Sequence, residues 1–372
     1  MDSVIQLILI IMSQFVFYTM GAQPESDVEL EVVDTIDDVN RDEWNDVVER
    51  ATERTVFHRT EWLGAVESGL GYRVRHALLQ KDSNLIGVFP NVVLPYEKTP
   101  FRRLVSLQPG FGGPVLTTDR CEALALLAAR MPEQTAHQTL THQIRAAQTS
   151  YLGYNNILKT HGYRPTRDGC RFQLGLENGY DDVWNRMRSG RRRRIRRGRE
   201  NEYELIEEEL TDSNLQQFHE TYAQVMNRVG GETLPLTFLE QFRQLNSRVL
   251  LLTLRVDGEY AGGSIELLDE NNNTIHGFLS AVPEGAFEYN ASELLYDGVI
   301  QWGIEHSYET YDLGYTPSDA TDGLFKFKRS FGGEMVPNLS WERGCSPVWP
   351  LVRAGRSLYW SRYKSTGKVP SG

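Results

Sequence analysis

Hydrophobic positions recur with two different periods along this chain, and together they predict helices and strands in a fixed order. In the second half, helical spacing covers residues 215–228, 236–246, 292–306 and 323–331. Apolar runs with strand character cover residues 203–208, 249–256, 260–269, 274–281, 311–314 and 334–341. Asp257-Gly258 predicts a tight hairpin turn, and three asparagines at 271–273 predict the next one. This order predicts an α/β fold of the α+β type, with helices covering a mixed sheet.

The first half repeats the pattern of the second half. Four matches carry the alignment: Trp44 with Phe218 (218 − 44 = 174), Trp62 with Phe238 (238 − 62 = 176), 76–90 with 251–265 (offset 175), and 119–131 with 292–306 (offset about 173). An offset that drifts slowly while the element order is kept indicates two copies of one unit. We therefore predict tandem domains at residues 28–178 and 179–344, followed by a tail at 345–372.

Residues 1–27 do not fit this repeat. The stretch from Val4 to Met20 is almost wholly apolar, and its flank carries Asp2 where a signal peptide has a positive charge. It is also short for a membrane span, which needs roughly 20 apolar residues. Two interpretations remain: a hydrophobic anchor that gives peripheral membrane association, or a start codon placed upstream of a true first residue at Met20. We favour the second.

Charge is distributed very unevenly along the chain. The net charge is -11, yet nine arginines lie between Arg186 and Arg199, so the remainder carries -11 - 9 = -20. Such a basic island attracts anions: phosphate-bearing ligands, nucleic acid, an anionic membrane, or the acidic run that follows it. The three cysteines form no CxxC pair and the eight histidines show no metal-like spacing, so we predict no metal site. A reducing, cytoplasmic location fits the cysteine pattern.

The basic island has helical periodicity. A helix that begins at Asp181 and Asp182 would place Trp184, Arg191 and Ile195 near one stripe and turn most other arginines outward. The outward arginines are either solvated, paired with the following glutamates, or bound to an anion. We favour anion binding because so many like charges repel one another without a partner. The candidate phosphate-binding residues are Arg191, Arg192, Arg193, Arg194, Arg196 and Arg197.

Three stretches resemble a known family. They are the arginine-rich segment 186–205, YDLGY at 311–315, and GLFKFKRSFGG at 323–333, where Phe327, Lys328, Phe331 and Gly332 match an FK-x-x-FG signature. The order and spacing of elements resemble the GNAT acyltransferase fold, and the tandem copy resembles the FemAB-like transferases. The resemblance covers roughly residues 28–344. It implies transfer of an acyl or aminoacyl group to an amine, and in this family to a cell-wall precursor.

The resemblance makes Lys328 the first candidate catalytic residue. It would bind a substrate phosphate or carboxylate, or stabilise the oxyanion that develops during acyl transfer. Lys326 and Arg329 are further candidate phosphate ligands, although Lys326 is better explained as a solvated helix charge because residues two apart cannot share one helix face. Asp312 and Tyr315 in YDLGY are candidate acid–base groups, and neither is distinguished by its sequence context.

The acyl donor is left open by the sequence. In GNAT folds the loop after the central strand binds the donor's phosphates, and here that loop, residues 281–293, lacks the Q/R-x-x-G-x-G/A motif of acetyl-CoA binding. This departure counts against acetyl-CoA as the donor and leaves room for an aminoacyl-tRNA or another acyl carrier. Three functions are therefore considered: transfer to an amine of a phosphate-bearing envelope precursor or polysaccharide, acyl-CoA-dependent N-acetylation of a small amine, or non-catalytic RNA or membrane binding. No DNA partner is expected.

Overall fold

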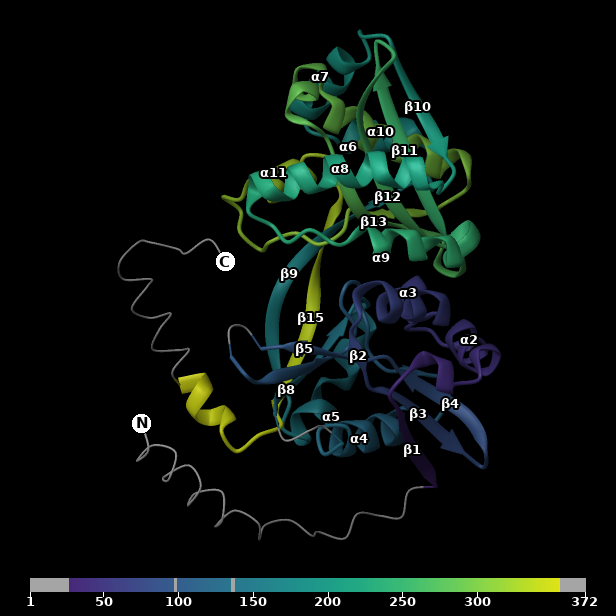
Figure 1. Ribbon diagram of the computed structural model, residues 1–372, viewed down its shortest axis with the longest axis vertical. Helices are drawn as coiled ribbons and strands as arrows, with labels where there is room; N and C mark the ends of the chain where they lie inside the picture. The colour runs from purple at the N-terminus through teal and green to yellow at the C-terminus, as the bar shows by residue number, and fades with distance from the viewer. Residues whose placement is uncertain (1–26, 97–98, 135–137, 355–372) are drawn as a thin grey trace.

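The computed structural model describes residues 27–96, 99–134 and 138–354. It consists of two halves, one above the other in Figure 1, that are joined by the long strands β9 and β15. The helices and strands of the first half are β1 (Val28–Val33), α2 (Arg41–Arg50), α3 (Thr60–Leu70), β2 (Arg73–Val74), β3 (His76–Lys81), β4 (Asn84–Phe89), β5 (Val92–Pro95), β6 (Arg102–Val105), β7 (Val115–Leu116), α4 (Arg120–Arg130), β8 (Thr139–Ala146), α5 (Asn155–Thr160) and β9 (Arg164–Gly175).

The second half repeats this order of elements, except that it begins with two additional helices and, among the described residues, lacks counterparts of the short strands β2, β5 and β6. It consists of α6 (Tyr180–Arg186), α7 (Ser189–Gly198), β10 (Tyr203–Glu208), α8 (Asp212–Val229), α9 (Leu236–Glu240), β11 (Val249–Val256), β12 (Glu259–Asp269), β13 (Thr274–Ala281), α10 (Ala291–Glu305), β14 (Thr310–Asp312), α11 (Gly323–Arg329) and β15 (Glu334–Gly344). The hairpin turn between β11 and β12 has positive φ at Asp257 (52°) and Gly258 (78°), as the sequence predicts for a primed turn. The mixed α/β fold with tandem copies is confirmed.

The two halves exchange strands. The large sheet has eleven strands in the order β10-β11-β12-β13-β14-β9-β15-β8-β6-β5-β2, and a second sheet has the order β1-β3-β4-β7. The end of β15 pairs with β8, so a strand from the C-terminal half lies inside the N-terminal sheet. The end of β9 pairs with β14, so a strand from the N-terminal half lies inside the C-terminal sheet. Sequence periodicity predicts each strand but not this exchange.

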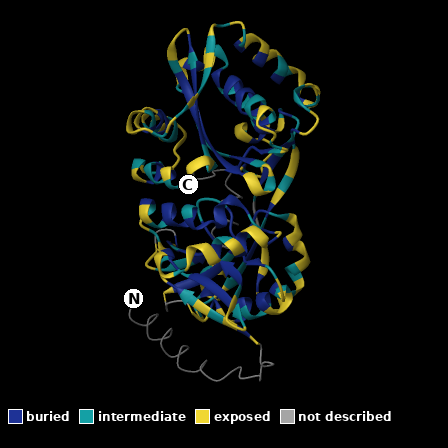
Figure 2. Ribbon diagram, turned by 90° about the vertical axis from the view of Figure 1, so that its right-hand side faces the viewer, coloured by how far each residue is buried: buried dark blue, intermediate teal, exposed yellow. Residues whose placement is uncertain are grey.

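Aromatic side chains fill the junction of the halves. The Trp62 ring on α3 meets Phe238, Phe242 and Phe278 of the second half at centroid distances of 5.7, 5.7 and 5.3 Å. All four belong to or pack against one core that includes residues of both halves. Figure 2 shows buried residues concentrated on the central strands, with exposed ones on the outward faces of the helices. The halves therefore share their packing as well as their strands.

The arginine-rich segment forms two helices, α6 and α7, where the sequence predicts one. The chain is extended at Met187 and Arg188, and the Arg188 amide donates to the carbonyl of Ser330 at 3.0 Å. This contact with the end of α11 interrupts the helix that the arginine periodicity predicts. Gly179 caps α6, so Asp181 and Asp182 lie in its first turn instead of capping it.

The described helices include none that is long and apolar enough to cross a membrane. The apolar stretch from Val4 to Met20 lies outside the described residues, as does the tail beyond residue 354.

Candidate active site

The parallel pairing of β13 with β14 stops soon after it begins, and this defines a split in the C-terminal sheet. Only Thr274, Ile275 and His276 of β13 pair with β14. Beyond that point Gly277 faces Gly314, whose φ is +76°, and a Cβ at Gly314 would overlap the carbonyl oxygen of Gly277. Gly314 is therefore required both by its backbone conformation and by the close approach of the two chains.

Lys328 reaches this split from α11. Asp322 caps the helix by accepting from the Phe325 amide at 2.9 Å, which fixes the direction of its first turn. The Lys328 side chain is buried, and its Nζ donates to the carbonyl of Tyr315 at 2.8 Å. A Cβ at Gly314 would lie 3.8 Å from Nζ, so the ammonium lies at the edge of the split. Burial lowers the pKa of Lys328 to about 8, although nearby Asp312 and Glu266 oppose the shift.

Glu266 lies beneath the same split on β12. The β12–β13 register shifts between Ile265 and Glu266, which pairs Glu266 with Gly277. Its carboxyl is buried, and burial raises its pKa to about 8 against the opposing effects of Ser264, Lys328 and Tyr311. Tyr311 donates weakly to Oε1 at 3.5 Å, while Oε2 has no hydrogen-bond partner within the part of the chain that the structure describes.

The sequence gives one neglected signal for Glu266. It is the only charged residue in the strand stretch 260–268, which is otherwise apolar or small. An acid in the middle of a buried strand costs free energy unless it has a partner or stays protonated, and so it marks a functional candidate. Our sequence prediction did not include it.

Asp312 lies close to this pair but is held by other groups. Its Oδ2 accepts from Arg171 at 2.5 Å and from Gln173 at 3.1 Å, and its Oδ1 accepts from the Gly314 amide at 2.9 Å. Burial alone would raise the pKa of Asp312, but Arg171 and these hydrogen bonds outweigh burial and lower it. Tyr315 is 48% exposed at the rim of the split, and its carbonyl positions Lys328.

The arginines of α7 divide into an inner and an outer set. Arg191 is buried, pairs with Glu293 of α10, donates to Ser330 Oγ at 2.8 Å, and lies 4.1 Å above the Phe327 ring. Arg192 donates to the Trp184 carbonyl at 3.4 Å. The outer set, Arg193, Arg194, Arg196 and Arg197, is exposed. Among the described residues, only Arg194 of this set has an ion pair, at 3.3 Å to Glu293.

The two basic neighbours of Lys328 point to solvent. Lys326 is exposed and donates to the Thr321 carbonyl at 2.6 Å, and Arg329 is exposed on the same short helix. The structure thus brings Lys328 to the split and leaves Lys326 and Arg329 outside it. This difference follows from helical geometry, since positions 326 and 328 face roughly opposite sides of α11.

The loop that follows β13 is folded into a short 3-10 helix, Glu284–Tyr289. The Ala286 amide donates to the Pro283 carbonyl at 3.0 Å and the Asn290 amide donates to the Phe287 carbonyl at 3.1 Å. These amides are therefore already hydrogen-bonded within the loop, and Glu284 and Glu288 on its surface add negative charge.

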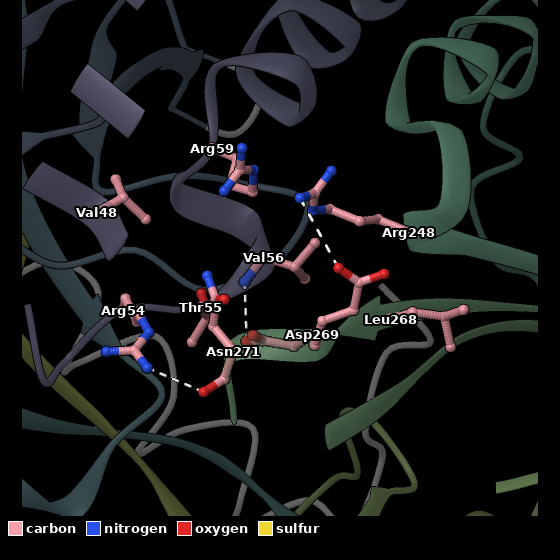
Figure 3. Close-up of a pocket in the computed structure, with 10 residues that line it drawn as sticks. Val48, Arg54, Thr55, Val56, Arg59, Arg248, Leu268, Asp269 and Asn271 are labelled. Atoms are coloured by element: carbon pink, nitrogen blue, oxygen red, sulfur yellow. Dashed lines mark hydrogen bonds and ion pairs between the residues drawn. The ribbon is translucent and has the colours of Figure 1, made fainter. Parts of the chain in front are cut away.

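A small cavity at the junction of the halves is a packing feature. It holds about 10 Å³ of free volume, room for about one water molecule. As Figure 3 shows, the Val56 amide donates to Asp269 (3.0 Å) and Arg54 donates to the Asn271 carbonyl (2.9 Å) across it. These contacts tie the first half to the end of β12.

Across the described ranges, no group of three or more His, Cys, Asp or Glu side chains is arranged to hold a metal ion.

Comparisons with known proteins agree with this geometry. Residues 185–329 match the family model described as an acetyltransferase (GNAT) domain. No match among curated proteins was found. The crystal structure of FemX is similar over 87% of this chain and 99% of its own, with 14% identity and a TM-score of 0.67.

Two further structures share the fold. The C-terminal domain of a putative lysylphosphatidylglycerol synthetase from Agrobacterium fabrum matches 80% of this chain and 92% of its own (15% identity, TM-score 0.54). A tandem GNAT protein from the clavulanic acid biosynthesis pathway matches 86% of this chain and 99% of its own (14% identity, TM-score 0.51). The chain is therefore an acyltransferase whose residues 185–329 match a GNAT domain, and it shares its fold with FemX and with the tandem GNAT protein.

Proposed function

We propose that this acyltransferase moves an aminoacyl group from aminoacyl-tRNA to an amine of a phosphate-bearing cell-envelope precursor, in the cytoplasm. The observation that carries the proposal is the pair formed by Lys328 and Glu266 at the split between β13 and β14. Both groups are buried, and the pKa of each is shifted to about 8. Shifts of this kind toward the working pH are characteristic of acid–base and charge-stabilising groups.

In the proposed reaction, the acceptor amine attacks the carbonyl carbon of the aminoacyl ester. A C–N bond forms, the ester C–O bond breaks, and the 3′ oxygen of the tRNA leaves. Glu266 accepts the proton that the amine nitrogen loses, and that proton then passes to the departing oxygen. Lys328 donates a hydrogen bond to the oxyanion that develops on the carbonyl, where a charged donor in a buried site is most effective.

The donor assignment rests on where phosphates can bind. Two amides of the loop after β13 are bonded within the loop, and the loop carries Glu284 and Glu288, so it is less suited to the diphosphate of a CoA. The outer arginines of α7 offer guanidinium groups that suit a chain of phosphates, and α7 packs directly on α10, which follows that loop. An acyl-CoA donor with a small amine acceptor remains the second candidate, since the matching family model is that of an acetyltransferase.

The acceptor assignment rests on similar chemistry. One protein with this fold is named for lysylphosphatidylglycerol, an aminoacylated lipid that carries a phosphate. Arg329, exposed beside the split, supplies positive charge at a suitable position for such a group.

Substitution of Glu266 by glutamine is expected to slow transfer by about 10²–10⁴-fold, the usual contribution of a general base. In the wild-type enzyme the rate should rise with pH up to about 8 as Glu266 loses its proton. The variant should lose this rise, which a pH–rate profile measures. A profile that keeps its shape in the variant would assign the base role to another group.

Stability provides an independent readout for the same variant. The pKa of Glu266 is about 8 in the folded chain against 4.5 for a free glutamate, so the folded state holds its proton between these pH values and the unfolded state does not. Its contribution to stability is therefore greatest below about pH 4.5 and falls as pH rises toward 8. The unfolding free energy of wild type relative to the variant should decline across this window. A constant difference would contradict the assigned pKa.

Substitution of Arg193, Arg196 and Arg197 by serine is expected to weaken aminoacyl-tRNA binding. Each guanidinium that contacts a phosphate contributes about one unit to the slope of log affinity against log salt concentration, so the slope should become shallower by about two to three. Filter binding at several salt concentrations measures it. Arg130→Ser, an exposed arginine on α4, is the matched control. Equal slopes for both variants would show that α7 does not contact the tRNA.

A further inference from the structure

A second site lies at the other end of β9 from the catalytic pair. A pocket of about 540 Å³ is formed where the beginning of β9 and the end of β15 are covered by residues 346–353. Arg164, Thr166, Trp349 and Arg353 are among its lining residues. Cys170, close enough to Lys328 to affect its pKa, is six residues from Arg164 along β9, which corresponds to about 20 Å. The pocket is thus separate from the split.

Arginines outnumber acidic residues in the wall of this pocket: Arg164, Arg343 and Arg353 line it together with Glu342, which lies opposite Arg164 in the β9–β15 pairing. Arg164 and Arg353 are both exposed, and neither forms an ion pair or a hydrogen bond within the described ranges. The other lining arginine, Arg343, donates to the Ala128 carbonyl at 2.5 Å. The excess of positive over negative charge makes the pocket attractive to anions, even in a chain of net charge -11.

A hydroxyl group in the pocket also has no partner. Thr166 Oγ1 is buried and, in the described part of the chain, makes no hydrogen bond. A buried hydroxyl without a partner costs free energy, and native structures usually satisfy it with water or a ligand. Arginine forks and a hydroxyl donor together match the oxygen atoms of a phosphate group.

The size and walls of the pocket narrow the ligand class further. The free volume lies within the range of small-molecule binding sites. Trp349 and two prolines, Pro165 and Pro350, give it apolar surface beside the arginines. We propose that this pocket binds a small organic phosphate, outside the catalytic split and independently of the transfer reaction.

Calorimetric titration of the full chain with inorganic pyrophosphate and with ADP tests this proposal. Saturable binding is expected, tighter for ADP because the pocket has apolar walls. The double variant Arg164→Ser, Arg353→Ser should bind both ligands at least tenfold more weakly. The control variant Arg73→Ser, which changes an exposed arginine on β2, should bind them as wild type does.

A second comparison separates this pocket from the tRNA surface. The α7 variant that lacks Arg193, Arg196 and Arg197 should bind pyrophosphate and ADP as wild type does. Loss of binding in that variant, equal binding in all variants, or absence of saturable binding would each overturn the proposal. Because binding is measured without acyl transfer, a failure of the proposed function would leave these outcomes unchanged.

Discussion

Replacement of Lys328 by methionine is expected to lower kcat for acyl transfer by about 10²–10³-fold, the usual effect of removing one donor to the developing oxyanion. Methionine keeps most of the side-chain volume, so the core around α11 should stay filled. It also removes a buried ammonium whose burial is unfavourable, as its lowered pKa of about 8 indicates. The melting temperature should therefore stay near that of the wild type while activity falls.

Two further variants make this test specific. Lys326→Met changes a lysine on the same helix that points to solvent, and it should keep kcat within about twofold. Lys328→Arg keeps the charge but changes the donor geometry, so it should recover only part of the rate. A large loss of thermal stability in Lys328→Met, or full activity in that variant, would show that Lys328 is structural or dispensable.

Division of the chain between residues 178 and 179 is expected to abolish independent folding of both parts. Fragment 28–178 loses β15, the strand that lies between β8 and β9, and fragment 179–372 loses β9, the neighbour of β14. The second fragment also buries Asp312 without Arg171, and an unpaired buried charge typically costs about 3–5 kcal/mol.

Circular dichroism and chemical denaturation of the separate fragments measure this effect. Neither fragment should show the cooperative unfolding of the intact chain, and refolding of the two together should restore it. A cooperative transition for fragment 28–178 alone, at the midpoint of the intact protein, would mean that β15 is not needed by the N-terminal sheet.

The order of elements could be predicted because local patterns determine it. Strands β11 and β13 have the predicted bounds, 249–256 and 274–281, since continuous apolar runs end there at turn residues. The tandem arrangement was predictable for a related reason: two copies of one packing unit keep hydrophobic residues at equivalent positions.

The features that the sequence did not predict depend on contacts between distant segments. The exchange of β9 and β15 is a choice of partner, which periodicity does not encode. The break between α6 and α7 arises from a hydrogen bond between Arg188 and Ser330, over 140 residues apart. Glu266 was overlooked because an apolar run marked its strand as structural, and its role as a candidate base emerges only from its position beside Lys328 and Gly277.

The choice of donor is tested most directly by a transfer assay with two labelled donors. Purified protein is incubated with radiolabelled aminoacyl-tRNA or radiolabelled acetyl-CoA, together with an extract of envelope precursors from the source organism. We expect label to pass from aminoacyl-tRNA to a phosphate-bearing amine, and the transfer to be lost in Lys328→Met. Saturable binding of acetyl-CoA, with transfer of its acetyl group and no transfer from aminoacyl-tRNA, would contradict the proposed function.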